Sequence, residues 1–143
     1  MIELDDSKAR LQVARVHGWL AQSYWSPGIT LPLVERAIRG SHCLGGYADN
    51  GDQVAFARMI TDHATFGWLA DVWVEPQWRG VGLGRRMVDW FVDHPDFAGI
   101  RRIMLNTRDA HGVYAAAGFA APVRPNFLME RLEPGAAERL RIL

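Results

Sequence analysis

The residues with the clearest chemical potential form a glycine-rich turn in front of an expected helix. Gly80, Gly82 and Gly84 stand at alternate positions directly after a buried apolar segment. Glycine lets the backbone adopt φ values that other residues resist, and it lets a ligand approach closely. The first N–H groups of the following helix have no partner within it and lie at the positive end of its dipole. Because such a turn binds phosphate oxygens, the pattern predicts a phosphate-binding loop.

Arginines surround this loop, although the chain as a whole has a formal net charge of zero. They are Arg79, Arg85 and Arg86. A Walker loop requires Gly-Lys-Ser/Thr, and the one lysine of the chain, Lys8, is far away in the sequence. The dinucleotide fingerprint Gly-x-Gly-x-x-Gly fails as well, because its third glycine would fall at Arg85. A turn without a ligand remains as the alternative, and the entropic cost of three glycines at a helix start argues against it.

Two further side chains could take part in proton transfer. Tyr114 is a phenol with an ordinary pKa of about 10, so it could donate a proton at neutral pH, or it could simply pack. Asp71 lies in an apolar segment, where a carboxylate is costly unless it lines a cleft or is hydrogen-bonded. It could accept a proton directly or through water, hold a cationic amine, or be purely structural. Regular alternation would place the even-numbered residues of 68–74 on one face and Asp71 with Trp73 on the other.

A mixed sheet with helices on both faces is expected to position these residues. Apolar periodicity predicts helices over 12–23, 82–94 and 109–117, and a further helix capped by Thr30 and ended by Gly40. Strands are expected over 1–4, 42–48, 53–61, 66–74 and 100–106, followed by a last strand or two that include 127–132. Asn50-Gly51 predicts a tight hairpin turn. The order is β-α-α-β-β-β-α-β-α-β-β, an α/β (α+β mixed-sheet) fold, with 133–143 as a terminal helix or frayed tail.

Composition limits the class of protein. The 143 residues suggest one domain over 1–143, and 49% hydrophobic and 22% charged residues are typical of a soluble globular protein. Zero net charge argues against nucleic acid and membrane surfaces as partners. Cys43 is the only cysteine, and the acidic N-terminus is no signal peptide, so we expect a reducing, cytoplasmic location. The five histidines lack metal-ligand spacing, so no metal is expected.

The glycine loop and the Tyr114 segment together resemble the GNAT superfamily, the Gcn5-related N-acetyltransferases. Arg79-x-x-Gly82-x-Gly84 follows a strand that ends in Asp71-Val72-Trp73-Val74 and opens a helix, as the family's acetyl-CoA signature does. Thr107-x-x-Ala110-x-x-Val113-Tyr114-x-x-x-Gly118-Phe119 is similar to the family's Asn-x-x-Ala-x-x-Leu-Tyr-x-x-x-Gly-Phe segment, with Thr107 in place of the commoner Asn. The resemblance covers almost the whole chain. It implies a GNAT-like acyl-CoA N-acyltransferase fold with splayed central strands.

The resemblance also implies acetyl-CoA as cosubstrate. Its pantetheine arm would enter the gap between 66–74 and 100–106 and pair with backbone groups of Val72 and Val74, a form of strand addition. The implied cofactor-binding residues are Val72, Trp73, Val74, Arg79, Gly80, Val81, Gly82, Leu83, Gly84, Arg85, Thr107 and Tyr114. Tyr114 stands at the family's general-acid position and would protonate the leaving thiolate. Asp71 is the candidate base.

The implied reaction is direct transfer of an acetyl group to a primary amine in a ternary complex, without a metal. Tyr24, Trp25, Asp71 and His111 are candidates for the acceptor side, although aromatic residues at helical spacing are more often core. The acceptor would be a small-molecule or peptide amine. Alternatives are a CoA- or acyl-CoA-binding sensor without transferase activity and a nucleotide-binding domain. Sheet-edge strands and the tail offer surfaces for a homodimer, which no sequence feature decides.

Overall fold

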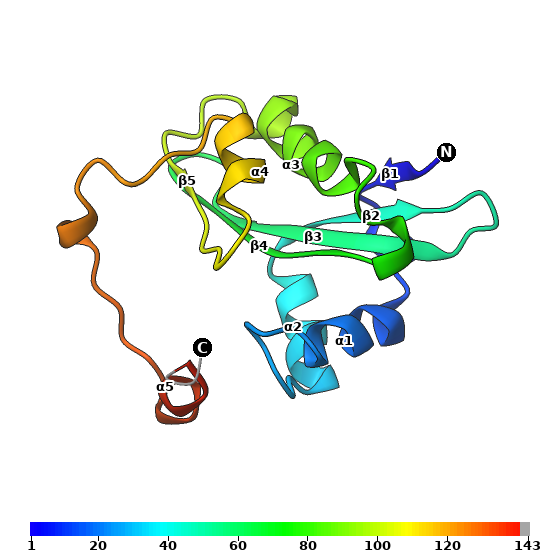
Figure 1. The fold of residues 1–143 in the computed structure, drawn as a ribbon, viewed down its shortest axis with the longest axis horizontal. Coiled ribbons are helices and arrows are strands. Elements are labelled where there is room, and N and C mark those ends of the chain that lie inside the picture. Colours follow the sequence, from blue (N-terminus) through cyan, green and yellow to red (C-terminus); the bar gives the residue numbers. More distant parts are fainter. Residues whose placement is uncertain (141–143) are drawn as a thin grey trace.

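A computed structural model describes residues 1–140 as a mixed sheet between two layers of helices (Figure 1). The strands are β1 (Glu3–Asp5), β2 (His42–Tyr47), β3 (Gln53–Thr61), β4 (Gly67–Val74) and β5 (Ile103–Met104). The helices are α1 (Val13–Ala21), α2 (Leu31–Arg39), α3 (Leu83–Asp93), α4 (His111–Ala116) and α5 (Pro134–Leu140). Single 3-10 turns cover Lys8–Arg10, Pro76–Trp78, Pro95–Phe97 and Pro125–Phe127. None of the helices in this part of the chain is long and apolar enough to cross a membrane.

The strands lie in the order β1-β2-β3-β4-β5. The first four are antiparallel neighbours, and β5 runs parallel to β4. The β4–β5 pairing holds only at Gly67 with Ile103 and at Trp68 with Met104, although β4 continues to Val74. The two central strands therefore part after a short contact. This confirms both the mixed-sheet class and the predicted splay.

Each face of the sheet has its own hydrophobic core. Helices α1 and α2 cover one face with a cluster that includes Val16, Leu20, Val34, Cys43 and Phe56. Helices α3 and α4 cover the other face with a cluster that includes Leu44, Met59, Leu69, Met87 and Phe91. The expectation of helices on both faces is confirmed, and Cys43 is a fully buried apolar residue, as its strand position predicts.

Asp71 interrupts the regular alternation of β4. Its φ of +56° is left-handed, and the register with β3 shifts between Phe56 and Arg58, so that β4 has one extra residue here. Such a β-bulge turns every later side chain to the opposite face. Leu69, Val72 and Val74 therefore all pack against the α3 core, while Trp73 packs against the α1–α2 core. The prediction that the even-numbered residues of 68–74 share one face is therefore wrong, because it assumed an unbroken alternation along the strand.

Three further expectations need correction. Thr30 lies at the N-cap of α2, but its side chain makes no capping hydrogen bond. The strand expected over 100–106 is limited to Ile103–Met104, because β4 diverges from it. The final strands, including 127–132, are absent from the described residues: 120–133 holds only the turn Pro125–Phe127 and extends away from the sheet (Figure 1). The tail forms α5, and 141–143 lie outside the described residues.

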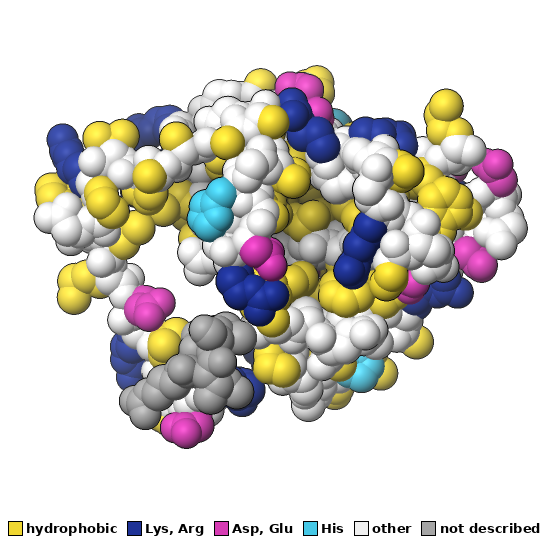
Figure 2. Space-filling view, viewed as in Figure 1, with side chains coloured by type: hydrophobic (Ala, Val, Ile, Leu, Met, Phe, Trp, Pro, Cys, Tyr) yellow, Lys and Arg dark blue, Asp and Glu magenta, His cyan; other side chains and the backbone are white. Residues whose placement is uncertain are grey.

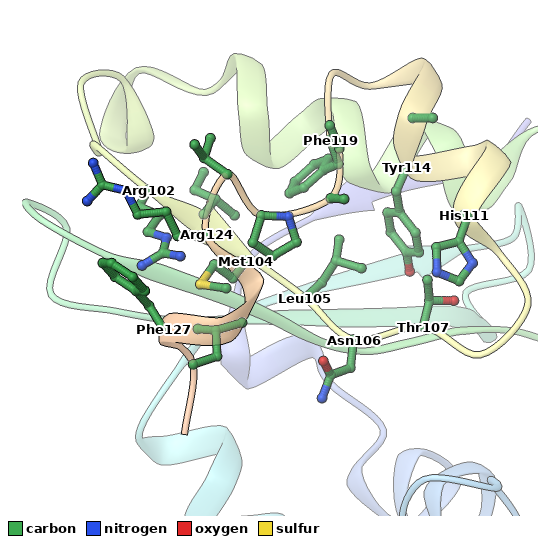
Figure 3. A pocket seen from close by; sticks show the side chains of 17 residues that line it. Arg102, Met104, Leu105, Asn106, Thr107, His111, Tyr114, Phe119, Arg124 and Phe127 are labelled. Atoms are coloured by element: carbon green, nitrogen blue, oxygen red, sulfur yellow. The ribbon is translucent and has the colours of Figure 1, made fainter. Parts of the chain in front are cut away.

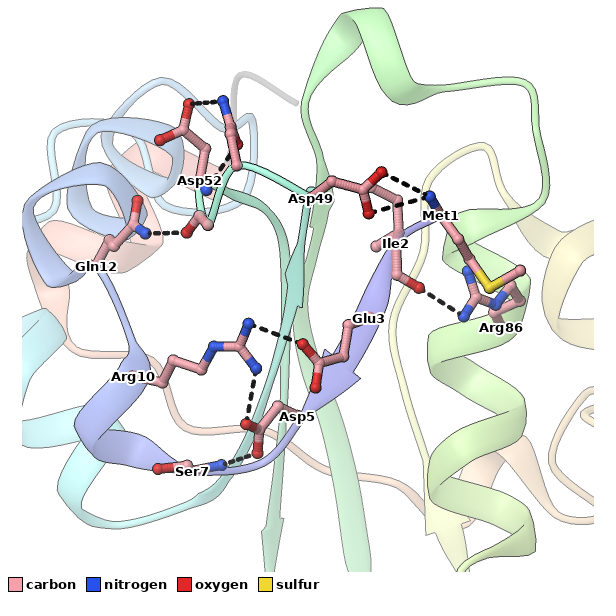
Figure 4. A network of polar contacts seen from close by, with 12 residues as sticks. Met1, Ile2, Glu3, Asp5, Ser7, Arg10, Gln12, Asp49, Asp52 and Arg86 are labelled. Carbon is pink, nitrogen blue, oxygen red and sulfur yellow. Dashed lines mark hydrogen bonds and ion pairs between the residues drawn. The ribbon is translucent and has the colours of Figure 1, made fainter.

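The N-terminal strand is held by a polar network (Figure 4). The Arg10 guanidinium reaches Glu3 at 2.9 Å and Asp5 at 3.0 Å. The Ser7 N–H and the Arg10 guanidinium together lower the pKa of Asp5. Arg86 of α3 donates to the Ile2 carbonyl at 3.0 Å. These contacts tie β1 to the 3-10 turn that follows it and to the helix that carries the glycine loop.

The close approach of the Tyr47 ring to Gly45 gives a test of packing in β2. A Cβ added at Gly45 would lie 2.7 Å from Cζ of Tyr47, whose ring is fully buried and cannot swing away. We expect Gly45→Ala to lower the free energy of unfolding by about 1–3 kcal/mol in urea denaturation. Gly18→Ala is the matched control, since a Cβ there meets nothing within 4 Å in the interior of α1. It should raise the stability by roughly 0.5–1 kcal/mol. Equal stability of Gly45→Ala and wild type would contradict this packing.

Candidate active site

The glycine loop presents unpaired N–H groups to open space. Gly80 and Gly82 have φ values of +82° and +83°, in the left-handed region that favours glycine. Gly82 is the N-cap of α3 and provides no side-chain cap. The helical ladder starts with the Arg86 N–H, which donates to the Gly82 carbonyl at 3.0 Å, so the N–H groups just before it have no acceptor in the described chain. A Cβ built at 80, 82 or 84 meets no atom within 4 Å.

The three arginines near the loop already have partners. The Nε of Arg79 donates to the Val74 carbonyl at 2.7 Å, and that of Arg85 pairs with Asp89 at 2.9 Å. Arg86 turns toward β1, as described above. Figure 2 shows this face of the molecule hollowed at its centre, with hydrophobic side chains in the hollow and Lys or Arg side chains beside it. Arg79 and Arg85 thus add positive charge beside the loop, whereas Arg86 serves the N-terminal strand.

The edge of β4 beyond the splay is open. The Glu75 N–H donates to the Val54 carbonyl in β3, so residue 75 directs its backbone toward β3. Successive residues alternate in this direction, and Val72 and Val74 therefore direct their backbone groups toward the gap beside β5. The backbone groups of Val72 and Val74, which are expected to pair with an extended ligand, therefore face this gap. The Val74 carbonyl is already occupied by the hydrogen bond from Arg79.

Tyr114, His111 and Thr107 lie side by side at the start of α4 (Figure 3). Thr107 Oγ1 accepts the Ala110 N–H at 3.0 Å, which stabilises the turn into the helix in the way a capping residue does. The Tyr114 hydroxyl has no hydrogen bond with a described residue. Burial, with a smaller contribution from Tyr24, raises the pKa of Tyr114 above its ordinary value. The phenol therefore keeps its proton at neutral pH, and His111 is exposed beside it.

Asp71 is buried and paired rather than open to solvent. Its Oδ1 accepts the indole N–H of Trp25 at 2.8 Å, and its Oδ2 accepts the Arg58 Nε at 2.6 Å. The Asp71 side chain is 8% exposed. Trp25 also packs against Trp73, with ring centroids 6.2 Å apart. As expected, Asp71 and Trp73 share a face, and the carboxylate holds the α1–α2 loop against β4.

A second contact joins the α1–α2 loop to the segment before α4. The Arg108 N–H donates to the Tyr24 hydroxyl at 3.0 Å, and the Arg108 guanidinium lies 4.0 Å from the centre of the Tyr24 ring. Tyr24 and Tyr114 are close enough for the one to affect the pKa of the other. The structure thus gathers residues from the N-terminal helices and from α4 around the end of β4, where the acceptor side was expected.

Sequence reasoning missed three residues of this region. Arg58 is the buried partner of Asp71, and an isolated charge within the apolar run of β3 was the available signal. Glu75, directly after β4, accepts a hydrogen bond from the indole N–H of the buried Trp19. Its position immediately before Pro76 was the available signal. Arg108 makes its contact through the backbone, which no residue pattern predicts.

Comparisons with known proteins agree with this fold. The acetyltransferase (GNAT) family matches residues 11–119. An acetyltransferase of Gibberella zeae is 32% identical over 71% of this chain and 68% of its own length. An aminoglycoside N(6')-acetyltransferase of Stenotrophomonas maltophilia is 30% identical over 62% of this chain and 66% of its own. The chain thus spans about two thirds of the length of these relatives.

Comparison with solved structures identifies proteins of the same fold. A GNAT-family protein of Xanthomonas campestris pv. campestris is 46% identical with a TM-score of 0.90, over 94% of this chain and 95% of the other. A Clostridium acetobutylicum structure with acetyl-CoA has a TM-score of 0.69 at 17% identity, over 92% and 96% of the two chains. The splayed sheet and the loop before α3 define an acetyltransferase fold, and this chain belongs to the GNAT family of acetyltransferases.

The Asp71–Arg58 pair predicts a measurable coupling. Arg58→Met leaves a buried carboxylate without its counter-charge, and we expect it to lower the free energy of unfolding by about 3 kcal/mol. Adding Asp71→Asn removes that charge while keeping a residue that tolerates a left-handed φ, so the double variant should regain more than half of the loss. Urea denaturation of the two single variants and the double variant measures the coupling. Additive losses would contradict a direct pair.

Proposed function

We propose that this protein transfers an acetyl group from acetyl-CoA to a primary amine by direct attack within a ternary complex. The observation that carries the proposal is the glycine loop at 80–85, whose N–H groups lack acceptors within the described residues and whose three glycines face open space. The left-handed φ of Gly82 leaves the start of α3 without a side-chain cap, so the first N–H groups of the helix are free to bind a ligand. A diphosphate supplies the missing acceptors and matches the positive end of the α3 dipole.

The open edge of β4 extends this binding site toward the acceptor side. The residues proposed to hold the CoA moiety by backbone groups are Val72, Val74, Val81, Gly82, Leu83, Gly84 and Arg85. Arg79 and Arg85 contribute charge, and Trp73 and Thr107 border the gap. Because Arg79 already donates to the Val74 carbonyl, it must release that carbonyl or share it with the ligand. Bound acetyl-CoA supplies the reactive thioester, and the chain supplies orientation.

Tyr114 is proposed as the general acid. Its hydroxyl has no hydrogen bond with a described residue, and its raised pKa keeps the proton available at neutral pH for the departing sulfur. Its place on α4, beside the gap between β4 and β5, fits this role.

Asp71 is proposed to act on the amine side. Its oxygens are oriented by Trp25 and Arg58, and each oxygen keeps a lone pair that could take a proton through a water molecule. The carboxylate also attracts a cationic amine before it is deprotonated. Turnover of Asp71→Asn across pH reports on this role, because a structural residue would leave the shape of the profile unchanged.

The acceptor is proposed to be a small-molecule or peptide amine. Tyr24, Trp25, Asp71 and His111 lie on the side of the site that would receive it. The Stenotrophomonas maltophilia relative is named for acetylation of an aminoglycoside, which supports the amine class. The aromatic rings suit the apolar body of an acceptor, and Asp71 suits its ammonium group.

Gly84→Asp tests the phosphate-binding loop without disturbing the fold. Gly84 lies in the first turn of α3 with a helical φ, where an aspartate is favourable for the helix dipole. Its carboxylate would face the open space assigned to the diphosphate. We expect acetyl-CoA to bind at least about 100-fold more weakly in calorimetry, because like charges meet.

The control for this loop is Gly51→Asp. Gly51 has equally open surroundings but lies in the hairpin turn between β2 and β3, with a left-handed φ that aspartate tolerates better than most residues. This variant should bind acetyl-CoA as the wild type does. Unchanged affinity in a folded Gly84→Asp protein would sink the proposed cofactor site.

Tyr114→Phe tests the general acid. We expect kcat to fall on the order of 100-fold with little change in acetyl-CoA affinity, because only the proton donor is lost. In the wild type, kcat should decline as the pH rises past the raised Tyr114 pKa, above about 10, and this alkaline limb should be absent from the variant. Equal turnover of the two proteins would leave Tyr114 with a packing role.

A further inference from the structure

In the site as proposed above, no group is assigned to the thioester oxygen. Attack by an amine moves the carbonyl electron pair onto this oxygen, and a hydrogen-bond donor aimed at it stabilises the charge that develops. The backbone groups of Val72 and Val74 are assigned to the pantetheine arm, and the Tyr114 proton is assigned to the departing sulfur. A further donor near Tyr114, with a proton not given to another group, would complete the site.

The α1–α2 loop crosses the gap at the start of the open edge of β4. The indole N–H of Trp25, in this loop, donates to Asp71 on β4 at 2.8 Å. The preceding residue, Tyr24, reaches the other side of the gap, where its hydroxyl accepts the backbone N–H of Arg108 at 3.0 Å. Two successive residues are thus attached to the two sides of the splay. The Tyr24 hydroxyl therefore lies where the open edge ends, on the acceptor side.

The Tyr24 hydroxyl has a proton without an acceptor. Its oxygen accepts the Arg108 N–H, and the hydroxyl donates to no described residue. The neighbouring donors are engaged, because the Trp25 indole and the Arg58 Nε both donate to Asp71. A phenol O–H is a donor as well as an acceptor, so accepting one bond leaves its proton available. Tyr24 therefore offers a donor of the kind that the site needs.

Three contacts hold the Tyr24 ring and strengthen its hydroxyl as a donor. The Trp25 ring meets it edge-on, with ring centroids 5.0 Å apart. The Arg108 guanidinium lies 4.0 Å from the ring centre, and the Arg108 N–H fixes the oxygen. A hydroxyl that accepts one hydrogen bond donates a stronger one, because the two bonds polarise each other. A donor that is fixed in advance needs no reorganisation when the charge develops.

Tyr24 and Tyr114 lie near each other but have different surroundings. Burial, with a smaller contribution from Tyr24, raises the pKa of Tyr114. The Tyr114 hydroxyl has no hydrogen bond with a described residue, whereas the Tyr24 oxygen is fixed by the Arg108 N–H. An unfixed phenol can follow a departing sulfur, and a fixed one suits an oxygen that stays in place. The two tyrosines can therefore serve the two atoms on which charge develops.

We propose that Tyr24 is a catalytic residue that donates a hydrogen bond to the thioester oxygen, a role that rests on the proposed acetyl transfer. The amine nitrogen bonds to the carbonyl carbon, and the electron pair displaced onto oxygen is stabilised by the Tyr24 O–H, which keeps its proton. As that pair re-forms the carbonyl, the C–S bond breaks and the sulfur takes the Tyr114 proton, which the phenolate regains from solvent. The amine proton passes through water to Asp71 and on to solvent. Removing one such donor lowers turnover on the order of 100-fold.

Infrared spectroscopy of bound acetyl-CoA tests this role without an acceptor. The ligand carries a heavy carbon isotope in its thioester carbonyl, so that the C=O band can be separated from the protein's own bands. A hydrogen bond to the oxygen lowers the frequency of this band, and Tyr24→Phe should therefore shift it to higher frequency. Tyr47→Phe is the matched control, because it removes a phenol oxygen that is buried in β2 without a partner in the described chain. Its band should match that of the wild type.

The possible results separate this role from the proposed function, with calorimetry reporting acetyl-CoA binding by each variant. Equal band positions for wild type and Tyr24→Phe, with acetyl-CoA bound to both, would overturn the role of Tyr24 and leave the cofactor site intact. A shift with His111→Asn in place of Tyr24→Phe would also overturn it, since the donor would then be His111, which is exposed beside Tyr114 (Figure 3). A folded wild type that binds no acetyl-CoA would overturn both proposals.

Discussion

The left-handed conformation of Asp71 is the constraint on which the site depends. The extra residue at this point of β4 reverses the alternation of the strand, and only then do the backbone groups of Val72 and Val74 face the gap beside β5. A left-handed φ is rare for a residue other than glycine and costs on the order of 1 kcal/mol. Here the ion pair with Arg58 and the hydrogen bond from Trp25 hold it in place. One carboxylate thus fixes the direction of the strand and the position of the α1–α2 loop.

The start of α3 shows the same relation between local cost and function. Gly80 and Gly82 occupy left-handed conformations, and the helix begins without a side-chain cap. Each of these features weakens an isolated helix end. The helix remains in place because its opposite face is buried through Leu83, Met87 and Phe91. The buried face therefore stabilises a helix whose first N–H groups remain unpaired. Phosphate oxygens bound at this helix end would offset the cost of leaving those N–H groups without acceptors.

Much of the fold was predictable because its signals are local. Gly51 marks the hairpin turn, and the apolar stripes of α1 and α3 mark their buried faces within a residue or two of the observed ends. The glycine loop was predictable from the spacing of its glycines, and the Tyr114 segment from its resemblance to the family's motif. The bulge was not, because nothing in the sequence around Asp71 requires a left-handed φ. The contact of Tyr24 with Arg108 was not either, since it joins a side chain to a backbone N–H across 84 positions.

The prediction of the final strands was wrong for a different reason. The run 127–132 was predicted as a strand, but only Phe127 in it has a high strand preference, and a strand exists only where another edge pairs with it. Pro122 and Pro125 lack N–H groups, so the segment before this run cannot continue as a paired strand along β5. The pocket beside β5 is lined by Tyr114 and Phe119, so α4 borders the edge of the sheet that this segment leaves open.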